Sequence, residues 1–327
     1  MNEQETKGIR LRGADFKYRY FHQCFIWVFL IAVIVIMSFA NENFATPYNF
    51  LNLFESSVTL LAVSMGQLLV ILTGGIDLSI SGLVSMANCI SIAIMTKYPS
   101  GGGLVLALAA TIAACMLGGA LNGFCVARLR LPAIIVTIAT CSIFNGIALL
   151  AMEIPGGSVN YAFADFINYK IGGFPVSFFL IVLMVIITTI FTNMTSMGKA
   201  IRAVGGNESA AFGSGVNVKK TKFMAYLLSG FYCALGGIYL GVRMYSADPN
   251  IGSNYAVYSI TATVVGGTLM TGAVGETVGT VAGVFIIYLI NNALNLLGVN
   301  NYYQFACQGT VLILALMIGC LESRSRK

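Results

Sequence analysis

The stretch SSVTLLAVSMGQLLVILTGGIDLSISGLVSMANCISIAIMT, residues 56–96, carries a single charged side chain, Asp77. A helix needs about 20 predominantly apolar residues to cross the hydrocarbon core of a bilayer. The uncharged runs on either side of Asp77, 56–76 and 78–96, are both long enough. They predict two membrane-spanning helices joined by a short glycine-containing segment.

The composition of the whole chain supports a membrane location. Hydrophobic residues make up 57% of the chain and charged residues 9%, whereas a soluble domain carries about 25% charge. The apolar excess must therefore face lipid. The eight cysteines show no CxxC spacing, and His22 is the single histidine, so we expect no catalytic residues, no metal site and no cofactor. No basic face interleaved with aromatic residues suggests a nucleic-acid partner.

Charged residues divide the chain into nine long uncharged runs. The final run is broken near its middle by the turn-forming sequence Gly298-Val299-Asn300-Asn301 and is therefore interpreted as two spans. The prediction is an all-α polytopic membrane protein with about ten transmembrane helices in a compact bundle. The first run could instead be a signal peptide, but its length favours an uncleaved helix. The runs are 20–41, 56–76, 78–96, 98–127, 131–152, 171–198, 223–242, 249–275 and 277–321.

The positions of the basic residues predict the orientation. Cytoplasmic loops carry an excess of Lys and Arg. With the N-terminus inside, fifteen of the 18 basic residues fall inside, and Lys97, Lys170 and Arg243 remain outside. Both termini are thus expected in the cytoplasm, as tails at 1–19 and 323–327 flanking a transmembrane domain at 20–322. A cytoplasmic loop at about 196–222 separates five spans from five, a division typical of transporters.

The segment between the second and third spans is the first candidate for function. It reads TGGIDLS, Thr73 to Ser79, and its glycines can interrupt a helix or allow close backbone approach. Asp77 is either a group on a transport pathway or a cap on the third span. A similar segment, GGTLMTG at 266–272, occupies the corresponding place in the second half. Paired interruptions of this kind indicate a transport pathway, with Gly74, Gly75 and Asp77 as its first candidate residues.

Amides inside the spans are the second candidate. They could line a corridor for a neutral polyhydroxylated solute, or they could hydrogen-bond between helices. No span carries the repeated arginines of a voltage sensor or the chain of carboxylates of a proton relay, so ion coupling is not favoured. The candidate amides are Asn88, Asn122, Asn145, Asn291 and Asn295, with Gln308 as a further member.

The third candidate is the cytoplasmic stretch GKAIRAVGGNESAAFGSGVNVKK, 198–220. Asn207 is a favourable N-cap and Glu208 would complement the dipole in the first turn of a short helix. Gly213 or Gly215 would end this helix, and Phe212 would be its apolar knob. The chain has no phosphate-binding loop, so any ATP hydrolysis would take place on another polypeptide.

Five pieces of the sequence carry a resemblance to a known family. They are ILTGGIDLSISG (71–82), LPAIIVTIAT (131–140), GKAIRAVGGNESAAFGSGVNV (198–218), VVGGTLMTG (264–272) and NNALNLLGVNNYYQ (291–304). The chain resembles the permease subunits of ribose-type monosaccharide ABC importers, which are bacterial inner-membrane proteins. One departure is Ser209: the family often reads Asn-Glu/Pro-Glu-Ala-Ala in this region, whereas this chain has serine at the third position.

The resemblance implies the partners of the chain. A second permease, identical or different, would complete the membrane channel, a cytoplasmic ATPase with tandem ATP-binding domains would drive it, and an extracytoplasmic binding protein would deliver the monosaccharide. It also implies that a coupling helix contacts the ATPase, through Gly206, Asn207, Glu208, Ser209, Ala210, Ala211, Phe212 and Gly213.

Other functions are compatible with parts of the sequence. A permease of the same superfamily could carry an autoinducer furanone, a nucleoside or a branched-chain amino acid. An ion-coupled secondary transporter would show ATP-independent uptake. A membrane-embedded enzyme would need an intramembrane constellation of His, Ser or Asp, and the spans show none.

Overall fold

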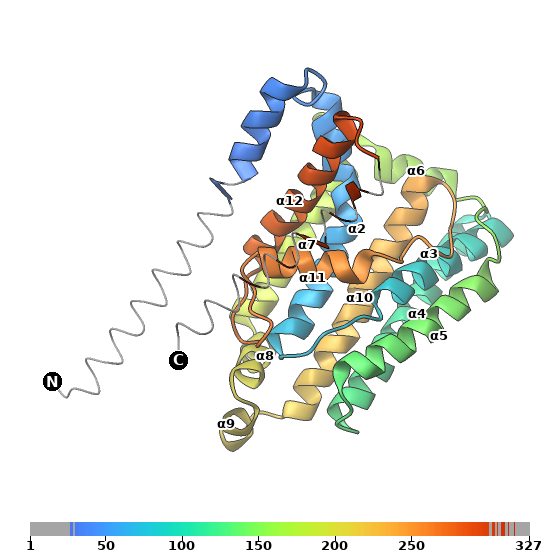
Figure 1. Ribbon diagram of the computed structural model, residues 1–327. Helices are drawn as coiled ribbons and strands as arrows, with labels where there is room; N and C mark the ends of the chain where they lie inside the picture. The colour runs from blue at the N-terminus through green and yellow to red at the C-terminus, as the bar shows by residue number, and fades with distance from the viewer. Residues whose placement is uncertain are drawn as a thin grey trace.

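The computed structural model describes residues 27, 28, 30–300, 303, 304, 306, 309, 310, 313 and 317. Nearly all of its regular structure is helical (Figure 1). A single hairpin of two-residue strands, β1 (Lys170–Ile171) and β2 (Phe174–Pro175), accompanies the helices in this part of the chain. The helices are α2 (Pro47–Leu72), α3 (Ile80–Lys97), α4 (Gly101–Ala127), α5 (Ala133–Ala151), α6 (Tyr161–Asn168), α7 (Val176–Met194), α8 (Ser196–Gly206), α9 (Glu208–Gly213), α10 (Val218–Met244), α11 (Tyr255–Val265) and α12 (Thr277–Leu296).

Seven described helices are long and apolar enough to span a membrane: α2, α3, α4, α5, α7, α10 and α12. The chain is therefore a multi-pass helical membrane protein, as predicted. The expected total of about ten is not reached in the described residues. The first expected span is represented by Leu30–Ala40, and the run after Asn301 lies largely outside these residues, as do the two expected tails.

The prediction of a full span over 249–275 is wrong. Helix α11 has 11 residues and ends where Gly266 and Gly267 follow it. Eleven residues at 1.5 Å each extend about 16 Å, roughly half of the hydrocarbon core. Gly267 has a φ of 88°, a conformation that glycine adopts without steric cost. The rest of the run forms non-helical segments on both sides of this half-length helix.

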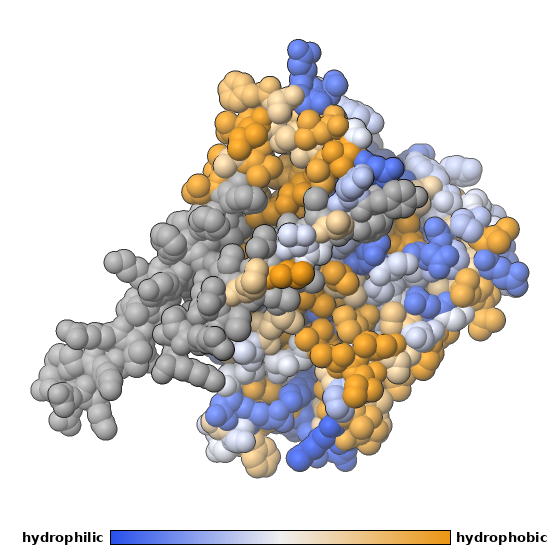
Figure 2. Space-filling model, in the orientation of Figure 1, coloured by the Kyte–Doolittle hydropathy of each residue, from blue (hydrophilic) through white to orange (hydrophobic). Residues whose placement is uncertain are grey.

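The helices differ in how deeply they lie in the bundle. In the most apolar 18-residue stretch of α2, 89% is buried inside the protein, whereas the corresponding share is 28% in each of α4, α5 and α7. Helix α2 is therefore central, and α4, α5 and α7 present apolar side chains outward. Figure 2 shows apolar residues over much of the visible face, with hydrophilic residues at the top and bottom of the view and on part of its right side. This distribution fits a bundle that is surrounded by lipid.

Glycines allow the central helices α4 and α10 to approach closely. A Cβ added at Gly119 of α4 would lie 2.3 Å from the Tyr226 carbonyl oxygen of α10. One added at Gly230 of α10 would lie 2.2 Å from the Cys115 carbonyl oxygen of α4. The backbones of α4 and α10 are thus in direct contact, which side chains larger than hydrogen would prevent.

The bundle has two distinct ends. We name the end with α8, α9 and the first residue of α10, Val218, the α9 end, and the opposite end, with α6, the α6 end (Figure 1). Lys97 and Arg243, predicted outside, lie in the last turns of α3 and α10. Helix α6 lies at this end, in the connection between α5 and α7. Which end faces the cytoplasm stays a prediction.

Candidate translocation and coupling site

The segment between α2 and α3 runs from the α9 end back into the bundle. Gly74 has a φ of 79°, which turns the chain out of α2. A Cβ at Gly75 would lie 2.7 Å from the Tyr226 hydroxyl, and that hydroxyl donates to the Ile76 carbonyl at 3.3 Å. Asp77 is fully buried and bonds Ser229, which lies about 16 Å along α10 from its start. Helix α3 therefore begins inside the bundle.

Asp77 holds a chain of buried hydrogen bonds. Its Oδ1 accepts from the Ser79 backbone N–H at 3.0 Å and from the Ser79 hydroxyl at 2.6 Å, and its Oδ2 accepts from the Ser229 hydroxyl at 2.8 Å. Asn122 Nδ2 donates to Ser79 Oγ at 2.7 Å, and Thr140 Oγ1 donates to Asn122 Oδ1 at 2.7 Å. We name these five residues the Asp77 network. It joins the start of α3 to α4, α5 and α10.

The capping interpretation of Asp77 needs correction. The N-cap position of α3 is Ser79, whose side chain makes no capping bond, and Asp77 precedes it by two residues. The carboxylate does accept one backbone N–H, that of Ser79, but its other partners are side chains. Asp77 therefore fixes the path of the segment that leads into α3, in addition to stabilising its first backbone group.

Replacing Asp77 by leucine is expected to destabilise the protein strongly. Three donors would lose their acceptor in a buried place, at about 1–3 kcal/mol each. Asp77→Asn should cost less because one carbonyl oxygen remains. The midpoint of thermal unfolding in detergent measures both effects. Asp165→Leu, at an exposed position on α6, is the control, and an equal midpoint for all three variants would contradict a central role for the network.

A second chain segment enters the bundle from the α6 end. Asp248 N–H donates to Asn88 Oδ1 at 2.9 Å, and Gly252 N–H donates to Ser85 Oγ at 3.0 Å. Ala256 N–H, in the first turn of α11, donates to Ser81 Oγ at 3.2 Å. The starts of α3 and α11 therefore meet inside the bundle. Interrupted helices with interior N-termini are typical of transporter substrate sites.

The predicted amides do not share one set of partners. Asn122 belongs to the Asp77 network, and Asn88 bonds the Gly237 carbonyl at 3.4 Å besides Asp248. Asn145 bonds Cys141 Sγ at 3.7 Å on α5. On α12, Asn295 Oδ1 accepts from Gln304 Nε2 at 2.6 Å, and Asn291 is half-buried. Helix α5 packs on α3 and α4, whereas α12 packs on α2, α7 and α11. Gln308 lies outside the described residues.

The short helix predicted after Asn207 is present as α9. The Asn207 side chain accepts from the Ala210 N–H at 2.9 Å, and Glu208 occupies the first turn. The helix ends at Gly213, and Gly215 has a φ of 83°. Ala211 packs in a small apolar cluster with Val204, Val216 and Val218, whereas the Phe212 side chain is 74% exposed. The helix is thus anchored on one side and presents an aromatic ring on the other.

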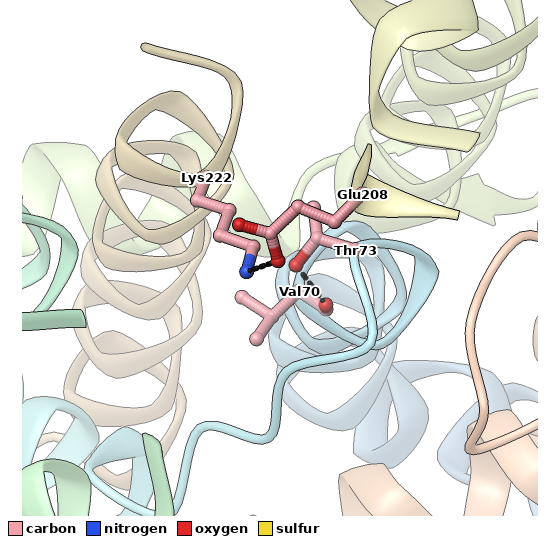
Figure 3. Close-up of polar contacts among 4 residues, drawn as sticks. All are labelled: Val70, Thr73, Glu208 and Lys222. Atoms are coloured by element: carbon pink, nitrogen blue, oxygen red, sulfur yellow. Dashed lines mark hydrogen bonds and ion pairs between the residues drawn. The ribbon is translucent and has the colours of Figure 1, made fainter. Parts of the chain in front are cut away.

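A cleft of about 1200 Å³ opens beside α9. Gly74 and Gly75 line it, together with residues at the end of α4, in the α4–α5 turn, in α9 and at the start of α10. Glu208 and Lys222 form an ion pair of 2.5 Å within this lining, and Figure 3 shows them pointing toward each other, with Thr73 in the same view. Lys222 was not singled out from the sequence, since it is one of several lysines in its loop. The first residues of the TGGIDLS segment and α9 therefore face one cavity.

Comparison with known proteins identifies the family. Residues 49–316 match the family described as branched-chain amino acid transport system, permease component. The chain is 36% identical over 292 residues to the ribose import permease protein RbsC of Bacillus subtilis, covering 88% of this chain and 90% of that one. It is 34% identical over 306 residues to the D-allose transport system permease protein AlsC of Escherichia coli, covering 90% and 91%.

A third relative is named for a different sugar from the first two. The galactose/methyl galactoside import permease protein MglC of Haemophilus influenzae is 30% identical over 321 residues, covering 93% of this chain and 94% of that protein. No solved structure matches the chain. The match to the family covers both interrupted segments and α9. The chain is therefore a member of this family of transport permeases, and its relatives include import permeases for sugars.

Proposed function

We propose that this chain is the membrane permease subunit of an ATP-driven importer, which carries a neutral monosaccharide across the bacterial inner membrane by alternating access. The observation that carries the proposal is the nearly full-length similarity to permeases named for ribose, allose and galactose. All three are neutral, polyhydroxylated molecules of similar size. The subunit itself is not an enzyme, and ATP hydrolysis takes place on a separate chain.

The structure supports a pathway through the middle of the bundle. The starts of α3 and α11 meet there, and the Asp77 network supplies hydroxyl and amide groups, which suit the hydroxyls of a sugar. These groups are paired with one another, so alternating access must exchange some of these bonds for bonds to the solute. The proposed pathway residues are Gly74, Gly75, Asp77, Asn88, Asn122, Asn145, Asn291 and Asn295.

The proposed partners follow from the two ends of the bundle. The α9 end faces the cytoplasm, where the exposed Phe212 and the adjoining cleft contact an ATPase subunit. The α6 end receives the extracytoplasmic binding protein. A second permease, identical or different, completes the channel. This orientation agrees with the concentration of Lys and Arg expected on the cytoplasmic side.

Uptake of labelled solutes tests the proposal. Cells that lack this chain should lose ATP-dependent uptake of ribose, allose or galactose, and the restored gene should recover it. The description of the family favours branched-chain amino acids as a second candidate, so leucine uptake is measured in the same cells. Loss of leucine uptake alone would show that the substrate is a branched-chain amino acid and not a monosaccharide. Uptake that persists in vesicles without ATP would exclude the ATP-driven mechanism.

Glu208→Arg is expected to weaken coupling while leaving insertion in the membrane unchanged. The arginine would face Lys222 and the positive end of α9, a change worth about 0.3–1 kcal/mol at an exposed helix terminus. That is too little to unfold the bundle. Binding-protein-stimulated ATP hydrolysis should nevertheless fall, by at least about fivefold.

A second substitution separates two explanations for this effect. Combining Glu208→Arg with Lys222→Glu restores an ion pair of reversed polarity. Recovery of ATP hydrolysis would show that the pair positions α9, whereas no recovery would show that Glu208 itself contacts the ATPase. Normal stimulated hydrolysis in the single variant would argue against any coupling role of Glu208.

A further inference from the structure

Three backbone segments meet at the α9 end without side chains between them. A Cβ added at Gly205 of α8 would lie 1.9 Å from the Leu72 carbonyl oxygen at the end of α2 and 2.7 Å from the Ala273 nitrogen. One added at Gly272 would lie 2.9 Å from the Gly74 nitrogen and 3.0 Å from the Gly205 Cα. We name Gly74, Gly205 and Gly272 the glycine junction. Its members are in backbone contact, so one cannot move toward another without displacing it.

Hydrogen bonds fasten the same segments together. Ala273 N–H donates to the Leu72 carbonyl at 3.0 Å. Arg202, one turn before Gly205 on α8, donates from Nη1 to the Gly275 carbonyl at 2.7 Å and to the Ala273 carbonyl at 3.4 Å. Bonds from a charged donor are stronger than neutral ones. Helix α8 is therefore held both by contact and by Arg202 to the turn around Gly272–Gly275.

The two segments that touch α8 lead into the bundle toward each other. From Gly74 the chain continues to the Asp77 network and the start of α3. The segment that contains Gly272 follows α11, and the first turn of α11 is bonded to Ser81 of α3. A displacement of α8 thus has two routes to the place where α3 and α11 begin.

We propose that Arg202 and the glycine junction transmit movement of α8 and α9 to the interior ends of α3 and α11. Arg202 is then a positioning residue for alternating access, because it acts through the turn at Gly272–Gly275, where it bonds two backbone carbonyls. The inference rests on the proposed function. It adds to that function a specific link between the helices that face the ATPase and the two interrupted segments.

The experiment uses the complete transporter, this chain with its ATPase and binding protein, reconstituted in liposomes. Arg202→Gln is compared with Lys199→Gln, which removes the same charge from an exposed position on α8. The ratio of labelled ribose, allose or galactose imported to ATP hydrolysed is measured, together with co-purification of the ATPase. The expected result is a fall in this ratio of at least about fivefold for Arg202→Gln alone, with co-purification unchanged.

A purely structural role for Arg202 predicts a different outcome. The unfolding midpoint would fall, but surviving transporters would import as much sugar per ATP as the wild type, and this result would overturn the proposal. If Arg202→Gln does not accumulate, Arg202→Lys takes its place, because lysine retains the charge but lacks the rigid guanidinium fork. An unchanged ratio of sugar imported to ATP hydrolysed in that variant would also overturn the proposal. The wild-type transporter tests the proposed function separately. If it imports no sugar, the proposed function fails, whatever the Arg202 variants show.

Discussion

Gly119→Val is expected to leave almost no folded protein in the membrane, whereas Gly146→Val should leave the wild-type amount. A Cβ at Gly119 would lie 2.3 Å from the Tyr226 carbonyl oxygen, which is backbone and cannot turn aside. The two added methyl groups of valine would push α4 and α10 further apart. Overpacking of an interior costs about 1–3 kcal/mol when side chains can adjust, and more is expected where backbone blocks the way.

The control for this prediction is matched in residue type and setting. Gly146 lies inside α5, and a Cβ added there meets nothing within 4 Å. Its neighbour Ile143 is exposed on the outer surface, so valine at 146 would face lipid. Fluorescence-detected gel filtration of tagged protein in mild detergent measures the folded amount. Equal peaks for the two variants would show that the contact between α4 and α10 is not essential for folding.

Loss of the contact between α4 and α10 would also disrupt the Asp77 network. Ser229 lies on α10 and Asn122 on α4, so separating these helices would draw apart two partners of the buried chain of hydrogen bonds. A weaker substitution, Gly119→Ala, should therefore reduce transport before it eliminates folded protein. Comparing uptake with folded amount in this variant distinguishes the two effects.

The sequence predicted the features of the fold that depend on local composition. Uncharged runs of about 20 residues located the seven long helices, and the cap Asn207 with Gly213 located α9. The half-length α11 was missed because Thr and Gly within 249–275 are compatible with a spanning helix by hydropathy alone. Where α11 ends, Gly266 lies against the backbone of Gly279 in α12, a tertiary contact that hydropathy does not reveal.

The candidate site was predicted only in part for the same reason. Asp77 was recognised because a carboxylate between apolar runs is rare. Two other members of the Asp77 network, Ser229 and Thr140, were missed, since a serine or threonine in an apolar helix is common and carries no signal of its own. Arg202 was counted as one basic residue among several in its loop, and its bond to the Gly275 carbonyl depends on tertiary structure.

Phe212→Ala is expected to weaken association with the ATPase by at least about 30-fold while leaving the permease folded. The ring is 74% exposed on a helix whose opposite side packs against Val204 and Val218. Aromatic side chains at the centre of an interface commonly contribute 2 kcal/mol or more to binding, and about 2 kcal/mol corresponds to that factor. An exposed side chain contributes little to folding, so the thermal midpoint should not change.

Tyr161→Ala separates this effect from the general loss of an exposed ring. Tyr161 is 71% exposed on α6, at the opposite end of the bundle. Affinity of the detergent-solubilised permease for the purified ATPase should fall for Phe212→Ala and stay unchanged for Tyr161→Ala. The reverse pattern would place the α6 end in the cytoplasm, and the binding protein would then have to meet α9. Equal affinity for both variants would show that the exposed Phe212 ring contributes nothing to binding of the ATPase.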